Sequence, residues 1–506
     1  MFRKITHAQG VVDEAEILFS TPFGYMFPEA AKSRLCLLPQ TEVTIQGLRA
    51  LGKAMADTGS AGNPMTHLDS TMDAAFTYLG QFIDHDITAR TDRDSSISML
   101  GRGEPIHPMD PDTVVATLRN GRRAQLDLDS VFGDGPGLAG SAVQATTQSQ
   151  TLYTNALKLD LFEDGTRSDL LRTKVTDLEG KETFVAKVAD SRNDENINVS
   201  QLHTAFLKFY NAVYDAQTGT DHEKYIRARQ LVRWAYQYIV VNDYLMTVCD
   251  QYVVLDTLAN GPRYVGATAG KGDAYMPLEF SVAAFRFGHS MIRPFYKLNE
   301  MATDVTIMEM LGTNAVAANF DTDNQLIAGR VIEWNNFVGA GAQNARKIDS
   351  KIAHDLFTLP FRPDDPVLTN LAQSNLFRAY NLSIPMGQAV CDGFGVNPLS
   401  PAELLDGEDA AIQDVLKEAY FHHRTPLWYY ILRESAIQQE GNRLGEIGSR
   451  IVAETIIGLL KQDPNCYLNN HHDPAVSDGG IDVNPGFGGL VSTLQGMLRF
   501  AGAPGL

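Results

Sequence analysis

The chain has 506 residues, of which 44% are hydrophobic and 20% charged, a composition typical of a globular protein with a buried core. Its formal net charge of −19 disfavours nucleic acids and anionic membrane surfaces as partners. The four cysteines form no C-x-x-C pair, which disfavours a zinc ribbon or redox motif and predicts unpaired thiols.

The start of the sequence, Met1 to His7, does not have the pattern of a secretory signal peptide. No apolar segment of about 7 to 15 residues follows it. No run reaches the roughly 18 apolar residues that a membrane-spanning helix needs. We therefore expect a cytoplasmic protein without a membrane span, with export by a route that keeps the N-terminus intact as the alternative.

Helical periodicity dominates the second half of the chain, and alternating strands are scarce. In chain order we expect a wrapping segment over residues 1–70 with a helix at 44–57, a helix over 74–86, long loops over 87–150, and a hairpin or coil over 151–190. Two apolar stripes then predict long helices: Ile226, Leu231, Trp234, Ala235, Tyr238 and Tyr244, followed by Leu444, Ile447, Ile451, Ile456 and Leu459. A third apolar helix is expected over 280–292, stopped by Pro294. The sequence thus predicts a mainly α fold and one domain, 1–506, in which the wrapping segment (1–70) precedes a core (71–506).

The segment from Gly80 to Asp86 contains the most informative pattern. Gln81, Asp84 and His85 stand at i, i+3 and i+4, so they share one face of the predicted helix, while Asp86 points elsewhere. An imidazole beside a carboxylate and an amide suits proton transfer, and Asp86 suits half of a hard-cation site. Half of a phosphohydrolase metal site is the alternative, but neither His-His pair near the C-terminus lies in a matching motif.

Two further motifs supply a fixed cation and a second histidine. Arg192 and Glu195 stand at i and i+3 where a helix is expected to start, although a surface ion pair would have the same spacing. His289 follows Phe287 and Gly288 in an apolar segment, and a glycine lets a flat cofactor approach the backbone. Two histidines in apolar segments suggest the two sides of a haem.

Two later motifs fit a cation and a ligating histidine. Residues 125–133 (QLDLDSVFG) alternate oxygen donors on an irregular loop, which suits a calcium ion completed by Asp86, although an Asp-rich turn has the same composition. Asn375 offers an amide that could orient the imidazole of an iron ligand and raise its basicity. Arg378 could pair with a haem propionate.

Taken in this order and with these intervals, the five motifs resemble the animal-type haem peroxidases of the peroxidase–cyclooxygenase superfamily. The resemblance covers about residues 23–501, and residues 443–469 are similar to the C-terminal helices of the bacterial members. It implies one large helical domain with haem between central helices and long ordered loops. It also implies haem b and Ca²⁺ as cofactors, and the oxidation of halides, thiocyanate or phenols with H2O2.

The resemblance implies a role for each matching residue. His85 corresponds to the distal base, Arg192 to the distal arginine, and Gln81 to the glutamine above the iron. His289 corresponds to the iron ligand, and Asn375 to its hydrogen-bonding partner. The other matches are Asp84 and Glu195 as carboxylates that form esters with haem, Arg286 and Arg378 at the propionates or the proximal edge, Asp86, Asp127 and Asp129 as calcium-binding side chains, and Arg123 and Gln125 as calcium-binding backbone oxygens.

Three positions depart from the family pattern. Asn196 stands where the most oxidising mammalian members carry a methionine bonded to a haem vinyl group, so that link is not expected and chloride oxidation is disfavoured. Asp129 replaces a serine in the cation loop and adds charge. Arg123 replaces a hydroxyl-bearing residue, so only its carbonyl oxygen could bind the cation.

Two other functions fit parts of the same resemblance. The fatty-acid dioxygenases of the superfamily share a tyrosine three residues before the proximal histidine, where this chain has Arg286. A haem-binding or adhesion protein without catalytic activity would need none of His85, Arg192 and His289. The peroxidase interpretation is therefore favoured, with H2O2 and a small reductant as partners, and the oligomeric state is not predicted.

Overall fold

Helices make up most of the regular structure in this computed structural model, which confirms the prediction of a mainly α fold. The structure describes residues 21–57, 68–88, 107–133, 135–136, 152–176, 180, 182–265, 275–312, 316–359, 369–485 and 487–506. Residues 1–20 and 58–67 of the predicted wrapping segment, and 89–106, 134 and 137–150 of the predicted loops, lie outside these ranges.

The helices fall into a longer and a shorter group. The longer ones are α2 (Glu42–Ala54), α3 (Ala75–Ile87), α7 (Ile197–Ala216), α8 (Asp221–Ile239), α10 (Gln251–Asn260), α13 (Leu371–Asn381), α17 (Leu427–Gln439) and α18 (Glu446–Gln462). The shorter ones are α1 (Pro28–Lys32), α5 (Pro111–Thr117), α6 (Asp129–Phe132), α9 (Leu245–Val248), α11 (Leu278–Val282), α12 (Ile307–Met310), α14 (Gly387–Phe394), α15 (Pro401–Leu405), α16 (Ala410–Glu418) and α19 (Leu494–Phe500). Two 3-10 helices, η2 (Ser191–Asp194) and η4 (Ala284–His289), and one π-helix, η3 (Val240–Tyr244), belong to the site described below.

The strands are short and form small sheets among the helices. Three-stranded sheets have the orders β3-β1-β8 (Arg119–Asn120, Thr21–Gly24, Met276–Pro277) and β12-β13-β14 (Val476–Ser477, Gly480–Asp482, Leu490–Val491). Two-stranded pairs are β2 with β11 (Asp69–Asp73, Asn344–Arg346), β4 with β5 (Phe162–Glu163, Ser168–Asp169), β6 with β7 (Arg172–Thr176, Glu182–Ala186) and β9 with β10 (Phe295–Tyr296, Val305–Thr306). The antiparallel β6–β7 hairpin confirms the hairpin expected within 151–190.

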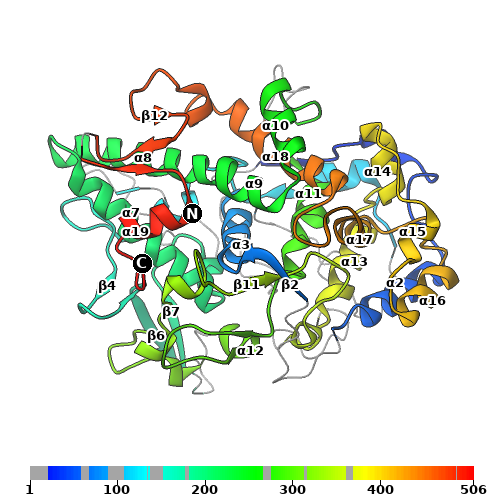
Figure 1. Cartoon of the computed structure of the whole chain (residues 1–506), viewed down its shortest axis with the longest axis horizontal. Helices are drawn as coiled ribbons and strands as arrows, with labels where there is room; N and C mark the ends of the chain where they lie inside the picture. The colour runs from blue at the N-terminus through cyan, green and yellow to red at the C-terminus, as the bar shows by residue number, and fades with distance from the viewer. Residues whose placement is uncertain are drawn as a thin grey trace.

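Helix α3 lies at the centre of the molecule (Figure 1), between α7 and α8 on one side and the α13–α17 region on the other. It contacts α7, η2, η3, η4 and α6. Its N-cap residue, Ala74, makes no side-chain capping bond, so packing and not capping stabilises this helix. Phe82 stacks on Phe206 of α7 with ring centroids 4.7 Å apart, which ties the middle of α3 to its neighbour.

Helix α8 continues into the π-helix η3, which brings Tyr244 against α3. The predicted stripe is buried at Leu231, Trp234 and Ala235, but Ile226 is 54% exposed, so its assignment to that stripe was wrong. Five residues separate Ile226 from Leu231, which is about 140° around a helix and therefore a different face.

The single apolar helix predicted over residues 280–292 was also wrong. Helix α11 ends at Val282, Ala283 adopts φ −130° and ψ −72°, and the 3-10 helix η4 follows. The Arg286 side chain donates from Nε to the Ser281 carbonyl oxygen at 3.2 Å, an oxygen that a continuous helix would bond to a backbone N–H. The break turns the chain before His289.

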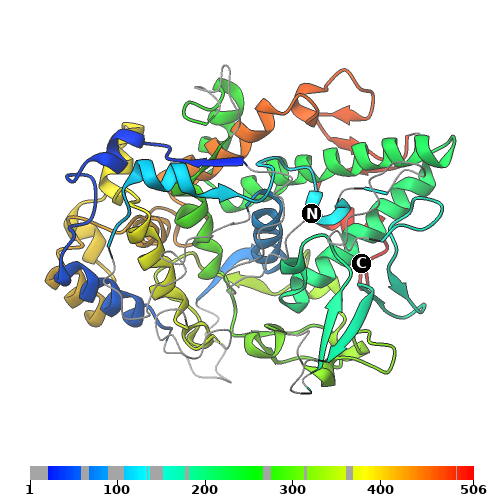
Figure 2. The ribbon, with the colours of Figure 1, turned by 180° about the vertical axis from the view of Figure 1, so that it is seen from behind.

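The described part of the N-terminal segment runs along the half of the helical body that contains α13 to α16 and reaches the centre (Figure 2). Strand β1 pairs antiparallel with β3 and parallel with β8, and α2 packs on α13 and α16. One cluster of buried apolar side chains runs through the molecule from Phe23 to Ala503. The division at residue 70 into a wrapping segment and a core stays a prediction.

The structure also bears on the predictions about the cysteines and about membrane-spanning helices. All four cysteines are free thiols, and three of them are buried, as expected. Within the described ranges, no helix is both long enough and apolar enough to cross a membrane.

Gly80→Ala is expected to destabilise the protein, although alanine is the better helix former by about 1 kcal/mol. A Cβ at residue 80 would lie 2.4 Å from the Tyr244 hydroxyl oxygen, so overpacking should lower the free energy of unfolding by about 1–3 kcal/mol. Adding Tyr244→Phe should recover part of this loss. Urea unfolding of the wild type, both single variants and the double variant measures the coupling; a Gly80→Ala protein as stable as the wild type would contradict the contact.

Candidate active site

His85 is fully buried on α3, and its neighbours define which ring nitrogen carries the proton. Its Nδ1 lies 2.9 Å from the side-chain oxygen of Asn193, and the amide nitrogen of Asn193 lies 3.0 Å from Nδ1 of His203. An amide oxygen only accepts, so Nδ1 of His85 must donate. Burial lowers the pKa of His203 to about 3, so this ring is neutral and accepts from Asn193. His85 in its neutral form therefore has its lone pair on Nε2, which faces Glu195 Oε1 at 3.6 Å.

Arg192 is held beside His85 by a buried carboxylate. Asp190 accepts from the backbone N–H of Arg192 at 2.9 Å, from its Nε at 3.1 Å and from its Nη2 at 2.7 Å. Nη2 also donates to the His85 carbonyl oxygen at 2.8 Å. Burial would raise the pKa of Asp190, but Arg122 and Arg192 outweigh it and hold the pKa well below its usual range. Asp190 is thus an anion that fixes the guanidinium.

Gln81 connects the helix face to the start of α7. Its amide nitrogen donates to Glu195 Oε1, and its amide oxygen accepts from Asn196 Nδ2 at 3.1 Å. The oxygen of Asn196 caps α7 by accepting from the Val199 N–H at 3.0 Å. Burial raises the pKa of Glu195 to about 8, so this carboxyl group holds a proton at neutral pH.

Asp84 is the second carboxyl group on this face. Burial raises its pKa, while Arg192 and Arg286 act in the opposite direction. Thr88, one turn later, donates its hydroxyl to Asp84 Oδ1 at 2.8 Å. Asp84 and Glu195 are close enough for the charge of Asp84 to raise the pKa of Glu195. The structure therefore brings together two carboxyl groups that the sequence separates by more than a hundred residues.

The second histidine lies on the segment that faces α3. His289 Nδ1 lies 2.7 Å from the amide nitrogen of Asn375, on α13, and the amide oxygen of Asn375 accepts from Arg286 Nη1 at 3.2 Å. If His289 ligates a metal through Nε2, its Nδ1 carries a proton and must donate. The Asn375 amide could accept this hydrogen bond if it were turned by about 180°, with its oxygen toward Nδ1. Arg378 lies on the same helix, one turn after Asn375.

Helix α3 and η4 contact one another. A small cavity lies beside the C-terminal end of α3, where Thr88, Ser281 and Arg286 are among its lining residues. A Cβ at Gly288 would meet no atom within 4 Å, so the backbone directly before His289 is open to a flat ligand.

A cluster of three carboxylates lies on another face of α3, about 100° around the helix from His85. Oxygen atoms of Asp86, Asp127 and Asp129 lie within 4.8 Å of one another. Asp86 accepts from the Leu128 N–H at 3.2 Å and from the Ser130 hydroxyl at 3.2 Å. Burial, followed by the charges of Asp129 and Asp127, raises the pKa of Asp86 well above its usual range.

In the predicted cation loop, two arginines lie beside the aspartates of the cluster. Burial raises the pKa of Asp129 to about 7, although Arg122 beside it acts in the opposite direction. The side chain of Arg123 pairs with Asp127 at 3.7 Å, and Gln125 lies between these residues on the same loop. Two buried carboxyl groups and one half-buried one, all with raised pKa values, are costly to ionise together, and a divalent cation would lower that cost.

Sequence reasoning missed four buried residues of this site: Arg122, Asp190, Asn193 and His203. An aspartate two residues before Arg192, at the start of a helical turn, is typical of an N-cap and could have identified Asp190. The other three have no local pattern, because their contacts join segments far apart in the chain.

A family model described as animal haem peroxidase matches residues 58–476. Among curated proteins, peroxinectin A of Dictyostelium discoideum is 26% identical over 241 residues, which is 46% of this chain and 41% of that protein. Peroxidase mlt-7 of Caenorhabditis elegans is 27% identical over 180 residues, 35% of this chain and 24% of that protein. The chain thus spans less than half the length of these relatives.

Two solved structures share the fold over nearly the whole chain. Peroxidase A from Dictyostelium discoideum has a TM-score of 0.59 at 17% identity and covers 91% of this chain and 92% of its own. A fatty acid alpha-dioxygenase from Oryza sativa has a TM-score of 0.55 at 16% identity and covers 95% of this chain and 77% of its own. Both likenesses concern the fold alone.

In the haem-free protein, Glu195→Gln is expected to flatten the pH dependence of stability between pH 4.5 and about pH 8. Burial raises the pKa of Glu195 from 4.5 to about 8, so in this range the folded state keeps a proton that the unfolded state has released. The stabilising contribution is complete below pH 4.5 and is lost as the pH rises through 8. Between these two pH values, the free energy of unfolding should fall by a few kcal/mol more in the wild type than in the variant. This is the order of magnitude expected for a pKa shift of this size.

Urea unfolding at both ends of this pH range measures the difference. Glu29→Gln, at an exposed carboxyl group of α1, is the matched control and should follow the wild type. Equal pH slopes in the wild type and Glu195→Gln would contradict the raised pKa.

Proposed function

The chain belongs to the animal haem peroxidase family, and we propose that it is a haem peroxidase that uses H2O2 to oxidise a small donor. The observation that carries this proposal is the orientation of His85. Its Nδ1 donates to Asn193, which leaves Nε2 as a base within a buried site beside a fixed guanidinium. Proton transfer of this kind requires a neutral imidazole with its lone pair directed at the reactant.

The residues on the two facing elements fit a haem. His85 and His289 lie on α3 and η4, which contact one another, and the open backbone at Gly288 leaves room for a flat ring. Arg286 lines a small cavity beside the end of α3. An imidazole that can ligate iron, an amide that can orient it and arginines that can pair with propionates are residues that suit a haem. When bound, haem supplies the redox centre that protein side chains lack.

On the distal side, three residues would handle peroxide. His85 would accept a proton from H2O2 at Nε2 and return it to the departing oxygen. Arg192, fixed by Asp190, would stabilise the negative charge that develops on that oxygen. Gln81 would hold water or a halide nearby through its amide.

On the proximal side, His289 would ligate the iron through Nε2, with Asn375 accepting from Nδ1. That hydrogen bond would raise the basicity of the ligand and fix the plane of the ring. In that orientation the amide nitrogen of Asn375 would face Arg286, which would no longer donate to it. Arg286 and Arg378 would face the propionates or the proximal edge.

We propose haem b as the prosthetic group, joined by esters to Asp84 and Glu195. Their raised pKa values support this, since a neutral carboxyl group is tolerated next to a porphyrin where two carboxylates would repel one another. Asn196, whose side chain caps α7 and donates to Gln81, offers no sulfur for a third link.

We also propose a calcium ion bound by Asp86, Asp127 and Asp129, with backbone oxygens from Arg123 and Gln125. Hard oxygen donors on an irregular loop are the ligands that calcium prefers. Tyr236 is a fully buried residue beside the same cluster. Burial raises the pKa of its hydroxyl well above the usual range, and the neighbouring Asp86 raises it further. A divalent cation would offset the repulsion among the three carboxylates.

The reductant is the least constrained part of the proposal. Halide, thiocyanate and phenolic donors all suit a site with Gln81 and Arg192 above the cofactor. Fatty-acid oxygenation is disfavoured because Arg286 occupies the position from which the dioxygenases are expected to supply a tyrosyl radical.

His85→Ala should keep haem but slow the first spectral change after H2O2 is added by about 10²- to 10⁴-fold, the usual contribution of a general base. Stopped-flow spectroscopy of the Soret band measures this rate. His222→Ala, at an exposed histidine on α8, is the control and should react as the wild type does. His289→Ala should lose most of the haem; an unchanged rate in His85→Ala would remove His85 from the distal role.

Acid–acetone treatment should leave haem on the wild-type protein and release it from a protein carrying both Asp84→Asn and Glu195→Gln. Each single variant should lose one link, which the mass of the haem-bound peptides reports. Asp112→Asn, at an exposed carboxylate of α5, is the control. Haem extracted freely from the wild type would keep the peroxidase and exclude the esters.

A further inference from the structure

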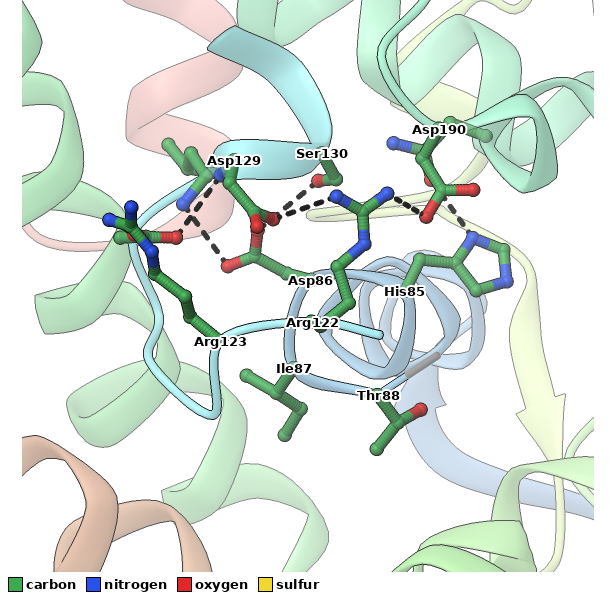
Figure 3. Close-up of polar contacts among 12 residues, drawn as sticks. His85, Asp86, Ile87, Thr88, Arg122, Arg123, Asp129, Ser130 and Asp190 are labelled. Carbon is green, nitrogen blue, oxygen red and sulfur yellow. Dashed lines mark hydrogen bonds and ion pairs between the residues drawn. The ribbon is translucent and has the colours of Figure 1, made fainter. Parts of the chain in front are cut away.

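The side chain of Arg122 joins two parts of the site that carry different proposed tasks. Its Nη1 lies 3.1 Å from Asp129 Oδ1 in the carboxylate cluster, and its Nη2 forms an ion pair with Asp190 Oδ2. Figure 3 shows this guanidinium between Asp129 on one side and Asp190 on the other, above the end of α3. Arg122 is only 6% exposed, so neither ion pair is replaced by water.

These contacts close a ring through the distal side. Asp190 accepts from Arg192 at 2.7 Å, and Arg192 donates to the His85 carbonyl oxygen at 2.8 Å. His85 is followed directly by Asp86, whose carboxylate lies in the same cluster as Asp129. A shift of any one charge in this ring therefore changes the forces on its neighbours, because buried charges are poorly screened.

We propose that Arg122 is a positioning residue that couples occupancy of the cation site to the position of Arg192. The inference rests on the proposed function, because it assigns a cation to the cluster and a peroxide-derived anion to Arg192. With a cation bound, Asp129 is neutralised and Arg122 shares Asp190 with Arg192. Without it, the uncompensated cluster attracts Arg122 toward Asp129, and Asp190 binds Arg192 alone.

The direction of the coupling follows from this competition. When Asp190 has only Arg192 as its partner, it holds that guanidinium more tightly and leaves fewer N–H donors for an anion above the iron. Cation binding should therefore raise the affinity of the distal side for an anion. Reciprocity requires the anion to raise the affinity for the cation by the same factor.

An arginine suits this task better than a lysine. The planar guanidinium presents separate nitrogens to two carboxylates at once, whereas an ammonium is a single point charge. Arg123, the next residue, is a natural control. Its side chain pairs with Asp127 of the same cluster at 3.7 Å and is 44% exposed, so it acts on the cation from the solvent side.

The test is a binding cycle on the haem-loaded protein with Ca²⁺ and cyanide as probes. Cyanide affinity is titrated optically with and without saturating Ca²⁺, and Ca²⁺ affinity is titrated calorimetrically with and without cyanide. We expect Ca²⁺ to raise cyanide affinity at least about fivefold in the wild type, the lower end of usual coupling, with the same factor in the reverse direction. Arg122→Met should reduce the factor to about one, while Arg123→Met should keep it, even if its Ca²⁺ affinity changes.

A wild-type factor of one, or an unchanged factor in Arg122→Met, would overturn the proposal. If Arg122→Met does not fold, Arg122→Lys keeps the buried charge without the fork, and a wild-type factor in that variant would overturn it equally. Failure of the proposed function has a different result, because a wild-type protein that binds no haem, or whose spectrum does not respond to H2O2, fails before the cycle begins. A protein that passes both checks but shows no coupling refutes the role of Arg122 alone.

Discussion

The arrangement of the distal side depends on one buried anion, Asp190, held between the guanidiniums of Arg122 and Arg192. A charge this deep is tolerated only when opposite charges and hydrogen bonds replace the water it has lost. Removing either arginine would leave Asp190 with one cationic partner in place of two. The three residues together join the loop before α6, the 3-10 helix η2 and the end of α3.

Helix α3 contributes to this unit because two consecutive residues serve different sites. A helix turns about 100° per residue, so His85 faces Asn193 and Glu195 while Asp86 faces the loop of Asp127 and Asp129. The helix has no capping side chain, and its rigidity comes from the packing of residues such as Phe82 and from the close approach of Tyr244 at Gly80. The packing of α3 at Gly80 and Phe82 thus helps to fix the position of His85.

The parts of the site that the sequence predicts are those with local spacing. Gln81 and His85 form a pattern within one helix turn, and the alternation of Asp127 and Asp129 lies within one loop. Asn193, His203 and Arg122 were missed because their partners come from distant segments, and only tertiary structure brings them together. The same distinction applies to the fold, where the helical periodicity of α18 was visible in the sequence.

The break after Val282 has no signal in the apolar periodicity of the sequence. Apolar periodicity continues through residues 280–292, yet the guanidinium of Arg286 occupies the Ser281 carbonyl oxygen that a helix would use. Arg286 also reaches Asn375, so the residue that interrupts the helix is part of the proximal side. Periodicity describes which faces are buried, but it does not show where a polar side chain replaces the backbone donor.

The contact between Asn193 and His203 has a consequence for the tautomer of the distal base. Burial holds the pKa of His203 at about 3, so this ring stays neutral and accepts from Asn193 throughout the range in which most proteins are folded. The amide of Asn193 therefore keeps one orientation, with its oxygen toward Nδ1 of His85. A second, buried histidine that takes no part in the reaction thus decides which nitrogen of the first one is free to act as a base.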